Sequence, residues 1–140
     1  MAPSDSFQFL HLTKVVAGHG SSDQAGEELR QLGATQVLIV TDRGIAASDV
    51  IGKITPGLER AGLRFEVFDG IEPNPAASAV ERAAEQARQL GADAILAVGG
   101  GSPIDAAKMV SVLAKRGGTV RDYEGIGTVP EPVLPLVALP

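Results

Sequence analysis

Apolar runs alternate with helical patterns along this chain. The stretch 36–42, QVLIVTD, is rich in β-branched residues, is apolar on both faces and ends in polar residues. Continuous hydrophobicity of this kind is typical of a strand that is covered on both sides, as in parallel sheets. Apolar runs at 63–70, 94–98 and 136–139 predict three further strands.

Between these runs, apolar residues recur at helical spacing. The segment 48–62 predicts a helix with a break or a new start near Pro56, because proline removes a backbone donor and crowds the preceding turn. The segment 75–91 carries one apolar stripe with charged residues on its other faces, and it predicts a second helix. A third helix is predicted over 103–115.

The beginning of the chain adds one more unit of the same kind. Residues 13–17 predict a short strand, and a Gly-Ser turn then leads to a helix over about 22–32. An exposed strand edge at 13–17 would be available to pair with another chain, as in a homodimer. The alternation of strand and helix predicts an α/β layered fold with a mostly parallel sheet.

Composition narrows the functional classes. A chain of 140 residues with 44% apolar and 21% charged residues is expected to form a single globular domain. The net charge of −5 argues against a nucleic-acid partner, which would need a basic patch. No apolar run approaches the roughly 20 residues of a membrane span.

Cysteine usage and the first residues suggest a compartment. The chain has no cysteine, which excludes disulfides and thiolate chemistry and fits a cytoplasmic protein. The first nine residues, MAPSDSFQF, lack the positive and apolar regions of a signal peptide. The two histidines, His11 and His19, both lie near the N-terminus, and no spacing of ligand-type residues indicates a metal site.

A glycine-rich turn is the strongest candidate for chemistry. Three glycines follow the run 94–98 directly, and Ser102 and Pro103 suit the N-cap and first position of the next helix. Glycines let a ligand approach the backbone, and a helix N-terminus offers free N–H groups to an anion such as a diphosphate. A turn without a ligand needs only two glycines, so three glycines favour the ligand. No Walker lysine follows, which argues against an ATPase.

Three other polar residues are candidates, each with a structural alternative. Asp42 would accept hydrogen bonds from ribose hydroxyls and repel a 2′-phosphate, or it would serve as a turn residue. Asp105 would reach a ribose or amide, or it would be a first-turn acid favoured by the helix dipole, with Lys108 as partner. Asn74 would be held towards a ligand by neighbouring prolines, or it would begin the next helix.

Taken together, these motifs resemble the iron-containing alcohol dehydrogenase family. GGGSPIDAAK at 99–108 is similar to that family's nucleotide signature, and VLIVTD, FDGIEPNP and LVALP occur in the family's order and spacing. The likeness covers about residues 13–140. The Ser-Pro-Ile-Asp version is more similar to the alcohol dehydrogenases proper than to glycerol dehydrogenases, maleylacetate reductases or dehydroquinate synthases, which share the fold. The resemblance implies a Rossmann-like sheet flanked by helices.

The resemblance also implies roles for individual residues. Asp42 matches the position that favours NAD over NADP, and Asn74 matches a loop residue near the adenosine. Asp105 matches the acid of the glycine motif. The full set of residues expected to bind the cofactor NAD is Asp42, Asn74, Gly99, Gly100, Gly101, Ser102 and Asp105.

One departure from the family limits the expected activity. The family continues from ALP into a Thr-Thr-Ala-Gly-Thr-like segment and a helical second domain, whose Asp and three His bind divalent iron or zinc; His11 and His19 do not match those ligands. We therefore expect residues 1–140 to be the NAD-binding domain of a larger enzyme that transfers hydride between a primary or secondary alcohol and NAD, inactive by itself. The alternatives are a stand-alone nucleotide-binding module without catalysis and a related zinc or metal-free enzyme.

Overall fold

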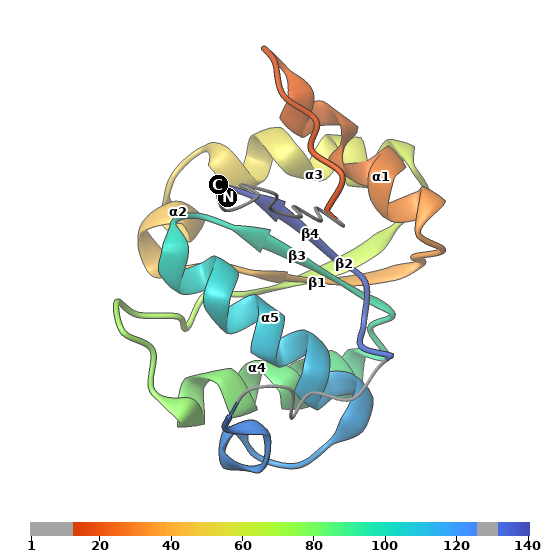
Figure 1. Cartoon of the computed structure of the whole chain (residues 1–140). Helices are drawn as coiled ribbons and strands as arrows, with labels where there is room; N and C mark the ends of the chain where they lie inside the picture. The colour runs from red at the N-terminus through yellow and green to blue at the C-terminus, as the bar shows by residue number, and fades with distance from the viewer. Residues whose placement is uncertain (1–12, 126–131) are drawn as a thin grey trace, which may run out of the picture.

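A parallel sheet forms the centre of the molecule (Figure 1). The computed structural model describes residues 13–125 and 132–140. Within them the four strands lie in the order β2-β1-β3-β4, and all three neighbouring pairs are parallel. Their bounds are β1 (Gln36–Val40), β2 (Arg64–Phe68), β3 (Ala94–Val98) and β4 (Leu136–Leu139). The predicted parallel α/β fold is confirmed.

Helices cover both faces of this sheet (Figure 1). One face packs against α1 (Ala25–Gln31) and α3 (Val50–Arg60), and the other packs against α4 (Ala77–Leu90) and α5 (Gly101–Arg116). The shorter elements are α2 (Arg43–Ala47) and the 3₁₀ turns η1 (Ser21–Gln24) and η2 (Val120–Tyr123).

The two central strands supply side chains to both layers of the core. Leu38 and Ile95 face α4 and α5, whereas Ile39 and Leu96 face α1 and α3, and all four are fully buried. The continuous hydrophobicity of β1 and β3 follows from this double coverage. β2 lies at an edge and accordingly exposes Arg64 and Glu66.

The predicted helix over 48–62 is present as α3, and it has no break and no new start at Pro56. A separate short helix, α2, precedes it, and α3 runs unbroken through Pro56. Proline crowds the carbonyl four residues earlier, which here belongs to Gly52. Both residues are exposed, so the freed Gly52 carbonyl can turn towards water. The expected break at Pro56 is therefore wrong.

The predicted strand at 13–17 is also wrong. Residues 14–17 have no regular structure, and the strand edge proposed there for pairing with another chain does not exist. Lys14 instead forms an ion pair with Glu28 of α1 at 2.7 Å, and Val15 remains 71% exposed. β-branched residues such as Val15 and Val16 form a strand only where a partner strand pairs with them, and residues 14–17 pair with none of the strands in the described ranges.

No helix in the described ranges has the length and apolar character needed to cross a membrane. The N-terminal stretch considered for a signal peptide lies outside those ranges.

Candidate functional site: a crevice at the carboxyl edge of the sheet

The strand order creates a crevice between β1 and β3. From β1 the chain moves to one side to form β2 and then crosses back over β1 to form β3 on the other side. The segments that leave the carboxyl ends of β1 and β3 therefore diverge, and ligands of open α/β sheets bind at such a switch point.

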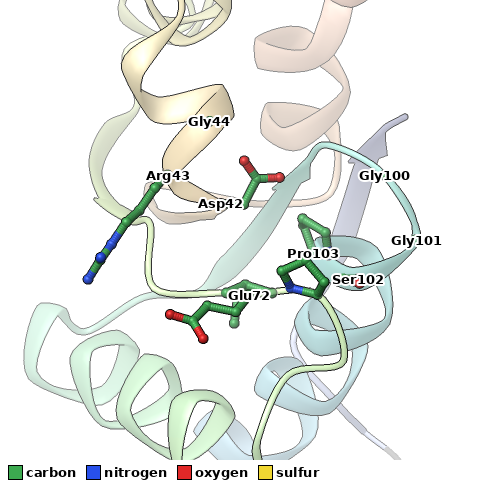
Figure 2. Close-up of a pocket in the computed structure, with 10 residues that line it drawn as sticks. Asp42, Arg43, Gly44, Glu72, Gly100, Gly101, Ser102 and Pro103 are labelled. Atoms are coloured by element: carbon green, nitrogen blue, oxygen red, sulfur yellow. The ribbon is translucent and has the colours of Figure 1, made fainter.

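A cavity of about 420 Å³ lies at this point (Figure 2). Its walls are the three segments that follow β1, β2 and β3. The lining residues are Asp42, Arg43, Gly44, Ile71, Glu72, Pro73, Gly100, Gly101, Ser102 and Pro103.

Only one of the three glycines has a backbone conformation that requires glycine. Gly99 is buried, with a φ of 131°, and a Cβ there would lie 3.0 Å from Cγ of Pro103. Gly100 has φ −76° and Gly101 begins a helix, and both are conformations that any residue adopts. A Cβ at either position would meet no atom within 4 Å. The absence of side chains at Gly100 and Gly101 thus keeps the cavity open rather than making the turn.

Helix α5 begins earlier than the sequence predicts. Gly100 is its N-cap, so Ser102 is the second helical residue and its expected role as N-cap is wrong. The extended backbone of Gly100 places its carbonyl to accept from the N–H of Ile104 at 3.3 Å. The N–H groups of Gly101 and Ser102 lie in the first turn, where no intrahelical acceptor exists. They remain available to an anion in the cavity.

Asp42 has a structural role and also lines the cavity. Its Oδ1 accepts a hydrogen bond from the N–H of Ile45 at 2.8 Å and so caps α2. Its other oxygen, Oδ2, faces the glycine turn, 3.4 Å from where a Cβ of Gly99 would lie. Both alternatives considered for Asp42 are therefore compatible with this geometry.

Two of the predicted site residues lie outside the cavity wall. Asp105 is exposed one turn into α5 and forms an ion pair with Lys108 at 3.2 Å. Asn74 is exposed beyond Pro73 and has a φ of 51°, in the left-handed region that asparagine tolerates. The structure thus brings together Asp42, Gly100, Gly101 and Ser102 around the cavity, with Gly99 buried beside them.

Several lining residues were not expected from the sequence. Arg43, Ile71, Glu72 and Pro73 contribute to the wall, and Ile71 is buried whereas the other three are exposed. In Figure 2 the Arg43 side chain extends away from the glycine turn. Their place in the sequence could have identified them, since each of these residues follows the end of a strand, where ligands of open α/β sheets bind.

The described residues contain no group of three or more His, Cys, Asp or Glu side chains arranged to hold a metal ion. His19 is exposed in a turn, and His11 lies outside the described ranges.

Comparison with known proteins identifies the family. The model of the family described as iron-containing alcohol dehydrogenase matches residues 13–140. The chain belongs to this family. NAD-dependent methanol dehydrogenase of Bacillus methanolicus is 35% identical over 124 residues, which cover 89% of this chain and 32% of that protein.

Solved structures of relatives have the same fold. NADH-dependent butanol dehydrogenase A of Thermotoga maritima matches with a TM-score of 0.85 and 34% identity over 95% of this chain and 34% of that one. Sulfoacetaldehyde reductase of Bifidobacterium kashiwanohense, solved in complex with NAD⁺, matches with a TM-score of 0.78 and 26% identity, over 88% of this chain and 32% of that one. This chain thus spans about a third of the length of these relatives.

Proposed function

We propose that residues 1–140 form the NAD-binding domain of an iron-containing alcohol dehydrogenase. The observation that carries this proposal is the cavity at the switch point between β1 and β3. At the start of α5 its wall is formed by Gly100 and Gly101, which leave space for a ligand. Relatives named as NAD-dependent or NADH-dependent, or solved with NAD⁺, support the same assignment.

The cavity fits the diphosphate of NAD. The N–H groups of Gly101 and Ser102 and the positive end of the α5 dipole would hold the phosphate oxygens. The open space over Gly100 would let the phosphates approach the backbone. Asp42 would accept hydrogen bonds from the adenosine ribose and disfavour a 2′-phosphate. Asn74 and Asp105, outside the wall, would contact the cofactor at its periphery.

The described residues do not fit a divalent metal, because no cluster of ligand side chains is present among them. In the proposed enzyme the iron or zinc ligands belong to the part of the relatives that this chain does not match. NAD, when bound, supplies the hydride acceptor for a small alcohol or the donor for an aldehyde. The residues described here bind and orient NAD, and this chain alone is not expected to oxidise alcohols.

The test is calorimetric titration of the 140-residue chain with NAD. In Gly100→Val the new side chain would occupy the cavity without straining the backbone, so we expect NAD affinity to fall by at least about tenfold. Gly52→Val is the matched control, because Gly52 lies on an exposed turn of α3 and also has open space around it. Equal NAD affinity of Gly100→Val and the wild type would show that this turn is not the diphosphate site.

A stand-alone nucleotide-binding module is the second candidate. It is favoured by the cavity itself, whose lining residues all belong to this chain. Joining the chain to the remaining two thirds of a relative, such as the methanol dehydrogenase, distinguishes the two. Alcohol-dependent reduction of NAD by the joined protein supports the enzyme, and nucleotide binding without turnover supports the module.

A further inference from the structure

Thr41 occupies a central position beneath the cavity. It follows β1 directly and is fully buried, and within the described residues only Thr41 and Ser111 are polar side chains in the core. Its backbone N–H donates to the carbonyl of Phe68 at 2.9 Å, and its carbonyl accepts from the N–H of Ile71 at 3.4 Å. Thr41 is thereby connected to the end of β2 and to the segment that follows β2.

The hydroxyl of Thr41 makes the connection to β3. Its Oγ1 donates to the carbonyl of Val98 at 2.7 Å. The backbone pairing of β1 with β3 ends one step earlier, at Val40 and Ala97. The side chain therefore joins the two strands beyond the point where their backbones pair. Val98 is only 2% exposed, so its carbonyl depends on a protein partner in place of bulk water.

The segments connected through Thr41 are the three walls of the cavity. Asp42 follows Thr41 in sequence, Ile71 begins the wall after β2, and Val98 immediately precedes the glycine turn. We propose that Thr41 is a positioning residue whose hydroxyl fixes the separation of these walls and thereby the fit of the nucleotide. This inference rests on the proposed function, because the nucleotide is the ligand assumed to fill the cavity.

Two substitutions separate the hydroxyl from the shape of the side chain. Thr41→Val keeps the branched shape and removes the donor, whereas Thr41→Ser keeps the donor. Ser111→Ala is the matched control: the Ser111 hydroxyl is also buried and also donates to a backbone carbonyl, that of Lys108 at 2.6 Å, but Ser111 does not line the cavity.

NAD affinity and amide hydrogen exchange of the nucleotide-free protein are both measured. Thr41→Val is expected to weaken NAD binding by about tenfold and to speed exchange at Ile71 and over 99–102. Thr41→Ser is expected to behave as the wild type. Ser111→Ala is expected to retain NAD affinity even if its melting temperature falls. A merely structural hydroxyl would change the melting temperature without this selective loss of affinity.

Each other result has a definite meaning. Unchanged exchange in the walls of Thr41→Val overturns the proposal, and so does faster exchange with unchanged NAD affinity. An unfolded Thr41→Val protein also overturns it, because the hydroxyl would then determine the whole fold. Failure of the wild type to bind NAD would refute the proposed function instead, and the exchange comparison would still support or overturn the role of Thr41 in holding the walls.

Discussion

Single residues at the crevice serve the fold and the proposed site together. Asp42 uses one carboxylate oxygen to cap α2 and presents the other towards the glycine turn. Gly99 is required by its φ of 131°, whereas its neighbours Gly100 and Gly101 leave space. Substitutions chosen at this scale can therefore separate a structural requirement from a requirement for ligand binding.

Asp42 allows such a separation. Asp42→Asn retains an N-cap acceptor for Ile45 and removes the negative charge, so stability should stay close to that of the wild type. Without the charge, the preference for NAD over NADP should fall by about tenfold, which titration with both cofactors measures. Asp42→Ala also removes the cap, and its unfolding free energy should fall by about 1 kcal/mol. An unchanged cofactor preference in Asp42→Asn would refute the assignment of this carboxylate to the ribose.

At the scale of the elements, close backbone packing joins α1 to α3. Gly26 of α1 is buried against Gly57 of α3, and a Cβ at Gly26 would overlap the carbonyl oxygen of Gly57. Such an overlap can be relieved only if the two helices move apart, because the contact is with backbone and not with a flexible side chain.

Gly26→Ala should therefore lower the unfolding free energy by about 1–3 kcal/mol, measured by urea denaturation. Gly52→Ala provides the control, because Gly52 is a helical glycine with nothing within 4 Å of the added methyl group. That substitution should raise stability by about 0.5–1 kcal/mol through helix propensity alone. Equal effects of the two substitutions would mean that α1 and α3 are not in close contact.

The elements also show what sequence patterns can and cannot predict. The central strands and α4 were predictable, because burial on both faces or on one stripe leaves a continuous or periodic pattern. The strand expected at 13–17 was not a strand, since two valines cannot indicate whether a partner strand pairs with them. The start of α5 at Gly101 and the passage of α3 through Pro56 depend on backbone conformation and on exposure, which the residue types alone do not determine.

At the scale of the whole molecule, different side chains join the central strands β1 and β3 at their two ends. Thr41 joins β1 to β3 at the carboxyl edge, beneath the cavity. At the amino ends of these strands, the carboxylate of Asp93 accepts hydrogen bonds from the Thr35 hydroxyl at 2.6 Å and from the N–H groups of Thr35 and Gln36, both at 2.9 Å. The cavity was predictable from sequence only in part, because Arg43, Ile71 and Glu72 join the glycine turn in lining it only when β1, β2 and β3 align in the sheet.

The charge on Asp93 makes the stability of the molecule depend on pH. Burial raises the pKa of Asp93, but the hydrogen bonds from Thr35 and Gln36 outweigh it and hold the pKa below its ordinary value of 3.8. A carboxyl group with a lowered pKa in the folded state contributes stability above the unfolded-state pKa, and this contribution is lost as pH falls through the folded-state pKa. Asp93→Asn should therefore be less stable than the wild type by about 1–2 kcal/mol at neutral pH.

The difference between Asp93→Asn and the wild type should shrink as the pH falls below 3.8, because the wild-type carboxyl group then also becomes neutral. Urea denaturation at a series of pH values measures it. Asp69→Asn is the control, since Asp69 is exposed and makes no hydrogen bond within the described residues, and its substitution should change stability little at any pH. A stability difference for Asp93→Asn that stays constant from neutral to acid pH would mean that the charge of Asp93 does not stabilise this end of the sheet. The hydrogen bonds would then act equally well from a neutral side chain.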